Sequence, residues 1–280
     1  MFNKNSDKNS SERRVGLLIQ YDGTNYSGWQ KQKNKIRTIQ ETIENEIKKL
    51  DNNANINLVG AGRTDAGVHA SGQVAHFDCS GFLPDGKWAP ALNGRLPNSI
   101  RILESVSRPS SWHACYSAIL RRYRYTIYNG IKPNIFLDPW VWHKYKCRLN
   151  EKIIKSAIQD LRGFHDFAAF CKAGSKRKHT WTTIHDIQIE RKGDLLFFEI
   201  QASGFIYGMV RLLVGQLVLV GEEKLSPEKF RERWVNKLRD DIKESAPANG
   251  LCLIRIGYIE PVFSIIQDTF PKYILNFKNS

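Results

Sequence analysis

The sequence, of 280 residues, has little that would direct it into a membrane or out of the cell. Its first fourteen residues are polar and lack the apolar core of a secretory signal, so residues 1–13 are interpreted as a disordered lead-in. The longest apolar stretch, roughly 205–221, is interrupted by Arg211 and Gln216 and is short for a bilayer span. These absences predict a protein with no membrane-spanning segment.

Cysteine is scarce as well, with five residues scattered along the chain and no C-x-x-C pair. Such an odd, dispersed set argues against a disulfide framework and against a structural zinc site. His69, His76, Asp78 and Cys79 lie close together in the sequence, but their spacing matches no zinc pattern. The sequence therefore predicts a reducing, cytoplasmic location and no bound metal.

Nucleotide-binding loops are missing too. No Walker loop is present, and Gly60 and Gly62 begin a G-x-G-x-x-G pattern that fails at position 65, where the chain has Asp65. The residues that follow also have the pattern of a strand rather than of a helix. We therefore expect no cofactor.

Positive charge is what the chain has in excess. Its 42 Lys and Arg outnumber its 28 Asp and Glu, which gives a net charge of +14 at pH 7, more than solubility requires. With 41% apolar residues, the chain can also bury a substantial core. A polyanionic partner is the first hypothesis, and nucleic acid is favoured over a membrane surface.

Local patterns predict a mixed α+β protein. Thr38 and Glu41 form a capping box, and Pro227 stands at a first helical position after Ser226. We predict helices over 38–50, over 151–161 closed by Gly163, from about 205 and from 227. The predicted strands cover 14–21, 56–59, 73–77, 100–106, 118–128 and 251–258, with a hairpin over 184–201.

Strand and helix signals recur in the two parts of the chain. We therefore predict an N-terminal α+β half over 14–112 and a C-terminal α+β half over 113–260, although no repeat is visible in the sequence. The tail, 261–280, fits a strand, a helix or a covering segment.

One stretch, residues 58–77, differs from the rest: LVGAGRTDAGVHASGQVAHF. Three glycines surround Arg63, Thr64 and Asp65, and glycines let another backbone or a ligand approach closely. Two interpretations of Asp65 are open. It is either a turn residue that bonds nearby amides or a carboxylate held for chemistry.

A second stretch, 121–128, alternates arginine with tyrosine. Arg121 and Tyr123 share one face of the predicted strand, while Arg122 and Arg124 share the other. Such a strand suits a nucleic-acid surface, and an amphipathic core strand fits equally well. The basic loop 172–179 is likewise either a solvated charge run or an RNA clamp.

The stretch at 58–77 resembles the G-R-T-D-A-G-V-H loop of the tRNA pseudouridine synthases of the TruA family. Further blocks are similar in the family's order: 21–24 with 28–30, then 121–125, then Phe205 with 209–211, then 250–251. The resemblance covers roughly residues 14–260. The chain departs from the family at 112–115, where F-H-A-R is usual, and at 178–181, where S-R-T-P is common.

This resemblance implies an enzyme that isomerises uridine to pseudouridine without a cofactor. The implied fold is α+β, with two related halves and an active-site cleft between them. Each half is a mainly antiparallel sheet with helices on one face, which is a ferredoxin-like or RRM-like arrangement. The implied partner is tRNA, with uridines 38, 39 and 40 of the anticodon stem and loop as targets, held by a homodimer.

The resemblance also assigns roles to residues. Asp65 is the catalytic carboxylate, which attacks C1′, attacks C6 or assists loss of the sugar's 2′ proton, and Arg211 is the cation beside it. For Arg211, a snorkelling helix residue is the alternative. Tyr123 meets the target uracil and takes part in catalysis. The implied substrate-binding residues are Tyr123, Arg63, Thr64, His69, Arg122, Arg124 and Phe205.

Two rival functions stay open from the sequence. A non-catalytic RNA-binding or tRNA-folding protein would keep the basic cleft and use Asp65 only in a turn. A related synthase that acts on other RNA would share every chemical motif.

Overall fold

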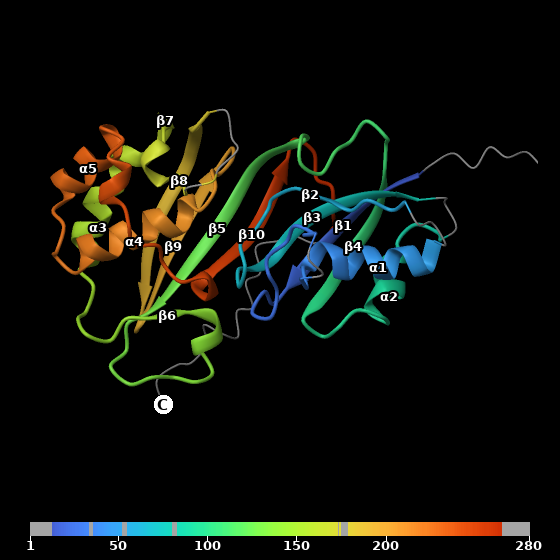
Figure 1. Ribbon diagram of the computed structural model, residues 1–280, viewed down its shortest axis with the longest axis horizontal. Coiled ribbons are helices and arrows are strands. Elements are labelled where there is room, and N and C mark those ends of the chain that lie inside the picture. Colours follow the sequence, from blue (N-terminus) through green and yellow to red (C-terminus); the bar gives the residue numbers. More distant parts are fainter. Residues whose placement is uncertain are drawn as a thin grey trace, which may run out of the picture.

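The computed structural model describes residues 13–33, 36–51, 55–79, 83–172, 174 and 179–264. Within these ranges the chain is a mixed α+β protein built on one ten-stranded sheet (Figure 1). The strand order is β4-β1-β3-β10-β5-β9-β8-β7, while β2 pairs with β3 and β6 pairs with β5. The coarse prediction of an α+β protein is confirmed.

Most of the strands are antiparallel to their neighbours. Their bounds are β1 (Arg13–Tyr21), β2 (Val59–Gly60), β3 (His69–Cys79), β4 (Ile100–Arg108), β5 (Ala118–Tyr128), β6 (Trp142–His143), β7 (Gly163–Asp166), β8 (Trp181–Lys192), β9 (Leu195–Ala202) and β10 (Leu251–Tyr258).

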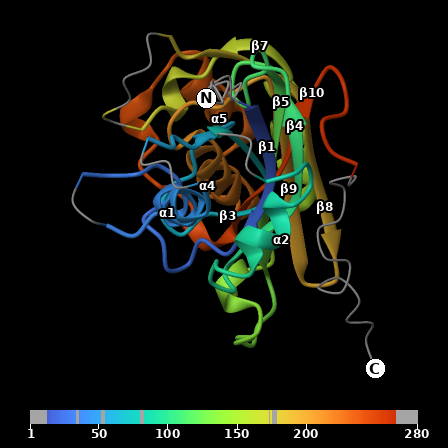
Figure 2. The same ribbon diagram turned by 90° about the vertical axis from the view of Figure 1, so that its right-hand side faces the viewer.

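The helices gather on one side of the sheet, as Figure 2 shows for α1, α4 and α5. Their bounds are α1 (Ile39–Asp51), α2 (Trp88–Asn93), α3 (Glu151–Ala157), α4 (Met209–Gly221) and α5 (Pro227–Val235). Short 3-10 turns complete the elements: η1 (Asp138–Trp140), η2 (Gln159–Leu161), η3 (Ala168–Phe170), η4 (Arg239–Asp241) and η5 (Ala248–Gly250).

Strand β10 lies in the middle of the sheet and joins its two parts. It is parallel to β3, with Cys252 opposite His69, and antiparallel to β5, with Leu253 opposite Tyr123. The Asp65 loop leads directly into β3. One strand therefore separates the strand that follows Asp65 from the strand that carries Tyr123.

Helix α4 is the most deeply buried helix. All its residues except Arg211 and Leu219 are buried, because the helix packs against α3, α5 and η3. Its one buried amide side chain, Gln216, accepts a hydrogen bond of 2.8 Å from Arg233. Among the residues that the structure describes, no helix combines the length and apolar character that crossing a bilayer requires.

Several predicted elements are confirmed, and three differ for physical reasons. The predicted strand over 56–59 is wrong except at Val59, since the amide of Leu58 donates instead to the buried carboxylate of Glu44, at 3.0 Å. The helix after residue 151 ends at Ala157, and Gly163 begins β7 with φ of 107° rather than capping a helix. The helix expected from about 205 begins at Met209, after Gly208 with φ of 74°.

The tail is described only as far as Ser264. Val262 and Phe263 pack against the core, and the amide of Ser264 donates to both carboxylate oxygens of Glu104, at 3.0 and 2.9 Å. These residues therefore form a covering segment. The predicted lead-in, except for Arg13 in β1, and the basic residues Lys176, Arg177 and Lys178 lie outside the described residues.

Candidate active site

The loop that carries Asp65 is held in place by hydrogen bonds to its main-chain carbonyl groups. The amide of Trp29 donates to the carbonyl of Thr64 at 3.1 Å, and the side chain of Gln73 donates to the carbonyl of Gly62 at 2.7 Å. Gly28 adopts φ of 87°, and a Cβ at this position would lie 2.6 Å from the Thr64 oxygen. Gly28 is thus required both by its conformation and by the close approach of the loop.

Asp65 does not use its carboxylate to stabilise the turn. Its carbonyl accepts a hydrogen bond from the amide of Val68 at 3.2 Å, but none of the described residues donates a main-chain amide to the carboxylate. The side chain instead forms an ion pair with Arg211, whose Nη1 lies 3.2 Å from Oδ2. The carboxyl side chain is 23% exposed, so one face of it is open to a ligand.

Arg211 is positioned in the first turn of α4. Its Nε donates to the carbonyl of Ala246 at 2.7 Å, while the amide of Ala246 donates back to the carbonyl of Arg211 at 3.0 Å. Its side chain is 18% exposed and contacts Asp65, which lies far from Arg211 in the sequence. The snorkelling interpretation of Arg211 is therefore wrong.

Tyr123 faces the Asp65 loop from β5. Its ring packs edge-on against Phe205, with centroids 5.0 Å apart, and a methyl group at Gly62 would lie 3.9 Å from its hydroxyl. Burial, together with the negative charge of Asp65, raises the pKa of Tyr123 well above its ordinary value. The hydroxyl is therefore protonated at neutral pH, and no described residue forms a hydrogen bond with it.

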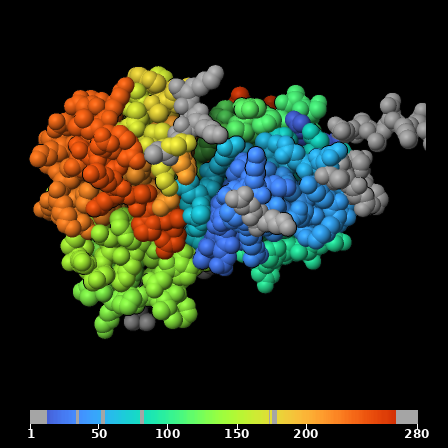
Figure 3. Space-filling model, in the orientation of Figure 1, coloured from blue at the N-terminus to red at the C-terminus, as the bar shows by residue number. Residues whose placement is uncertain are grey.

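The structure thus brings together Asp65, Arg211, Tyr123 and Phe205, which the sequence analysis selected from three separate blocks. In Figure 3 the N-terminal part, coloured blue to teal, and the C-terminal part, coloured orange to red, meet at the middle of the visible face. Residues from both parts build this cluster, which we call the Asp65 site.

Arg121 is a contributor that the sequence analysis did not select. Its Nη1 donates to the carbonyls of Ala118 and Ser203, at 3.1 and 2.8 Å, and its Nη2 to those of Ala61 and Cys115, at 3.2 and 2.9 Å. It therefore ties the Asp65 loop, the strand of Tyr123 and the segment before Phe205 together. The signal that could have identified it is its place on the same strand face as Tyr123.

Arg122 and Arg124 are not brought to the Asp65 site. They point from the opposite face of β5 and share the carboxylate of Glu199 on β9, with Arg124 Nε 2.6 Å from Oε1. The guanidinium of Arg124 also lies over the ring of Phe197, 5.4 Å from its centroid. That Arg122 and Arg124 bind the substrate stays a prediction.

The remaining residues that were predicted to bind the substrate are His69, Thr64 and Arg63. His69 is 4% exposed, accepts a hydrogen bond from the Gly23 amide through Nδ1, and lies with Nε2 3.2 Å from the carbonyl of Pro139. Burial lowers the pKa of His69, and its predicted role in substrate binding stays a prediction. Thr64 is buried and bonds the hydroxyl of Tyr21 at 2.8 Å, whereas Arg63 is exposed.

The residues weighed as metal ligands are occupied elsewhere. His76 accepts a hydrogen bond from the amide of Ala114, Asp78 pairs with Arg14 at 2.7 Å, and Cys79 donates to the carbonyl of Arg13. Burial, with the positive charge of Arg14, lowers the pKa of His76 to about 4. Within the described ranges, no three His, Cys, Asp or Glu side chains gather as a metal site.

The two departures from the family pattern have different surroundings. At 112–115, Cys115 lies against Arg121, with Sγ 3.8 Å from Nη2, while Trp112 and Ala114 are buried. At 178–181, Lys178 lies outside the described residues, whereas Trp181 is 46% exposed.

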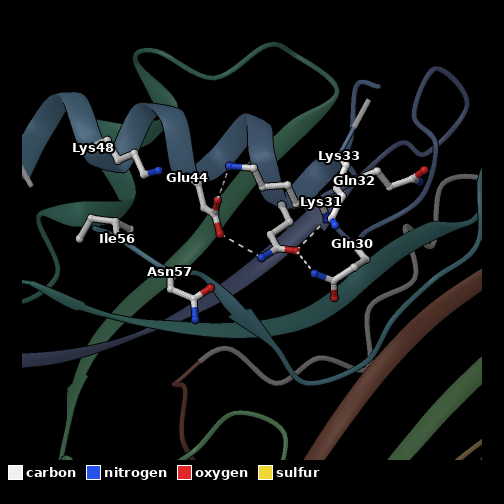
Figure 4. Close-up of a pocket in the computed structure, with 9 residues that line it drawn as sticks. Gln30, Lys31, Gln32, Lys33, Glu44, Lys48, Ile56 and Asn57 are labelled. Carbon is white, nitrogen blue, oxygen red and sulfur yellow. Dashed lines mark hydrogen bonds and ion pairs between the residues drawn. The ribbon is translucent and has the colours of Figure 1, made fainter. Parts of the chain in front are cut away.

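Two surface pockets lie apart from the Asp65 site. One, of about 450 Å³, is drawn in Figure 4, where Glu44 contacts Gln40 and Lys31, and Lys33 and Lys48 also line the pocket. The other, of about 610 Å³, lies between β7, β8 and α5. Neither pocket is lined by Asp65, Tyr123 or Arg211.

Comparison with known proteins adds independent evidence. A family model described as "tRNA pseudouridine synthase" matches residues 17–117 and 157–259. The chain is 56% identical over 270 residues to tRNA pseudouridine synthase A of Prochlorococcus marinus (strain MIT 9303), covering 96% of this chain and 91% of that protein. It is 59% identical over 252 residues to tRNA pseudouridine synthase A of Synechococcus sp. (strain CC9902), covering 90% and 84%.

Proposed function

This chain belongs to the tRNA pseudouridine synthase family, and from that membership we propose how its residues carry out the isomerisation of uridine to pseudouridine in tRNA. In this reaction the bond from C1′ to N1 breaks and a bond from C1′ to C5 forms. The proton on C5 leaves and N1 ends with a proton, so no electrons are exchanged with another molecule. The chain is thus an isomerase.

The observation that carries the proposal is the open carboxylate of Asp65 between Arg211 and Tyr123. Each route considered for the reaction, at C1′, at C6 or through the 2′ proton, needs a carboxylate oxygen beside the nucleoside. Arg211 orients the carboxylate through the 3.2 Å ion pair and is itself fixed by Ala246. The Asp65 side chain is therefore held in one orientation before the substrate arrives.

Tyr123 is the group that meets the uracil base. Its ring is supported edge-on by Phe205, and its raised pKa keeps the hydroxyl protonated beside the Asp65 carboxylate. A phenol in this position can donate to or accept from the base, and we propose that it assists departure of the C5 proton after the new bond forms.

The wider assembly is also proposed from the resemblance. The two related halves, over 14–112 and 113–260, would each have a ferredoxin-like arrangement, with the Asp65 site in the cleft between them. The targets would be uridines 38, 39 and 40 of the anticodon stem and loop, and a homodimer in the cytoplasm would hold the tRNA. The net charge of +14 supports binding to a polyanion of this kind.

The direct test uses purified protein and unmodified tRNA transcripts that carry tritium at C5 of uridine. We expect tritium release after exhaustive chelation and dialysis, with the tRNA folded beforehand, because the proposed chemistry uses only side chains of the chain. Mapping of the product should find pseudouridine at positions 38 to 40. If the protein binds tRNA but releases no tritium, it is the non-catalytic binder; if the product lies in another RNA, it is the related synthase.

A second prediction concerns Arg121. Replacing Arg121 by Met removes the donors that join the Asp65 loop to β5, so we expect turnover at saturating tRNA to fall by about 10- to 100-fold. Unfolding free energy should fall by about 1–3 kcal/mol, because the carbonyls lose their donor. Single-turnover kinetics and thermal unfolding measure the two effects.

The matched control is Arg101→Met, which also removes donors to carbonyl groups, those of Pro97 and Ile100. We expect it to leave turnover unchanged. Unchanged turnover in Arg121→Met as well would show that Arg121 stabilises the fold without positioning the loop.

A further inference from the structure

A buried amide side chain, Gln73 on β3, bonds the main chain of the Asp65 loop. Its Nε2 donates to the carbonyl of Gly62 at 2.7 Å, and its Oε1 accepts from the amide of Gly62 at 3.3 Å. The Oε1 atom also accepts from the amide of Val74 at 3.2 Å. Gln73 is 0% exposed. One buried side chain therefore satisfies both main-chain groups of a loop residue close to Asp65.

Gln73 acts at the point where the main-chain pairing beside β3 stops. Strand β2 pairs with β3, and just after β2 the amide of Ala61 donates to the carbonyl of Val74 at 2.7 Å. The next residue, Gly62, bonds the side chain of Gln73. A side chain thus continues the pairing of β2 with β3 into the Asp65 loop.

A β-bulge turns the side chain of Gln73 toward this loop. Ile19 on β1 lies opposite Gln73, and Tyr21 lies opposite Ala70, so β3 has one residue more than β1 between these two pairs. In a regular strand, residues three positions apart would point to opposite faces. The extra residue brings Ala70 and Gln73 to the same face, as bulges beside functional sites commonly do.

This face of the sheet also carries Tyr123 and Tyr21. Leu253 on β10 lies opposite both Ala70 and Tyr123, and residues that lie opposite one another share a face. Tyr21 shares this face through its pairing with Ala70, and its hydroxyl bonds that of Thr64 at 2.8 Å. Tyr21 is only 3% exposed. A second buried side chain of the sheet therefore holds the Asp65 loop.

The two anchored residues of the loop, Gly62 and Thr64, alternate with an exposed one. Arg63 lies between them and faces solvent. Asp65 follows Thr64 directly, so its carboxylate extends from a main chain that is held by both anchors. The anchoring side chains are themselves too deeply buried to contact a bound nucleotide.

We propose that Gln73, together with Tyr21, is a positioning residue for the isomerisation, because it fixes the main chain of the loop so that the Asp65 carboxylate lies where the reaction needs it. The effect belongs to the rate of the chemical step and not to tRNA binding, since both side chains are buried. The proposal rests on the proposed function for the role of Asp65.

The experiment measures single-turnover rates and tRNA affinity for Gln73→Met and Tyr21→Phe. Gln73→Met nearly keeps the shape of the side chain and removes its donor and acceptor, so we expect the rate at saturating tRNA to fall by about 10- to 100-fold. Tyr21→Phe removes one hydroxyl only, and we expect a fall of about 3- to 30-fold. In both variants the Kd for tRNA should stay within about 2-fold of the wild type.

The matched control is Asn129→Leu, which also removes a buried amide side chain that bonds main-chain groups. Asn129 follows the end of β5, donates to the carbonyl of Cys147 and accepts from the amide of Leu149, both at 2.8 Å. None of these groups belongs to the Asp65 loop, so we expect the wild-type rate. Thermal unfolding establishes that each variant is folded at the temperature of the assay.

Three results would overturn the proposal. The first is a rate within about 2-fold of the wild type in both Gln73→Met and Tyr21→Phe. The second is a wild-type rate that returns at saturating tRNA, because the loss would then lie in binding. The third is an equal loss in Asn129→Leu, because the loss would then follow from general destabilisation.

Failure of the proposed function gives a different result. Amide hydrogen exchange of residues 60–68 reports how firmly the loop is held, whether or not the protein is active. If the wild type releases no tritium but this exchange is faster in Gln73→Met, the catalytic assignment is refuted and Gln73 remains the anchor of the loop. Normal tritium release by the wild type, with unchanged rate and exchange in Gln73→Met, retains the function and refutes the proposal.

Discussion

Asp65→Asn is expected to reduce pseudouridine formation by more than about 10³-fold while tRNA binding stays close to that of the wild type. The amide has nearly the shape of the carboxylate, but it can neither attack the nucleoside nor accept its proton. The ion pair with Arg211 is partly exposed, so its loss should cost about 1 kcal/mol of stability or less. Tritium release under single-turnover conditions measures the rate, and filter binding measures affinity.

A matched variant separates this effect from the general loss of a carboxylate. Asp194 also stands in a glycine-containing turn and pairs with an arginine, Arg148, at 3.1 Å. Asp194→Asn should keep the wild-type rate. If Asp65→Asn also converts uridine at nearly the wild-type rate, Asp65 is a turn residue after all and another group performs the chemistry.

The second large effect is expected at Tyr123, where the ring and the hydroxyl can be tested separately. Tyr123→Phe keeps the stacking face and loses the polar group, so we expect near-normal tRNA binding with tritium release slowed by about 10²- to 10⁴-fold. Tyr123→Leu should also weaken capture of the base, with tRNA affinity lowered by about 5- to 100-fold. The two assays are run side by side for each variant.

Tyr125→Phe is the control for removal of a buried hydroxyl from the same strand. Its hydroxyl donates to the carbonyl of Pro247 at 2.8 Å, so the variant should lose about 1 kcal/mol of stability and keep its rate. Equal tritium release by Tyr123→Phe and the wild type would leave the hydroxyl without a role. Normal binding and release in Tyr123→Leu would make Tyr123 a core residue only.

Elements with strong local signals could be predicted from the sequence. The strand over 118–128 and the strand over 251–258 have the bounds of β5 and β10, and the capping box at Thr38 precedes α1. Local signals failed where a distant group decided the structure. The carboxylate of Glu44, remote from Leu58 in the sequence, takes the amide that a strand over 56–59 would have used.

The Asp65 site shows the same contrast between features that local sequence signals predict and features that distant groups decide. The resemblance of the loop motif and of the block around Tyr123 to the tRNA pseudouridine synthases identified residues that the fold does bring together. Strand alternation places Arg121 on the face of Tyr123 and Arg122 on the other face, but it does not show which groups each arginine contacts. Only the arrangement of the sheet shows that Arg121 faces Ala61 and Ser203, while Arg122 faces Glu199.

The central position of β10 also affects when, during its synthesis, this protein can become active. Residues 251–258 form the last strand among the described residues to leave the ribosome, and until they do, β3 and β5 have no strand between them. Pairing Cys252 with His69 closes a very long loop, which makes this a slow step of folding. In the nascent chain the facing edges of β3 and β5 are open to pairing with other chains. The Asp65 loop and Tyr123 come together only when β10 fills that gap, so under the proposed roles of these residues catalysis begins as a late event in the life of each chain.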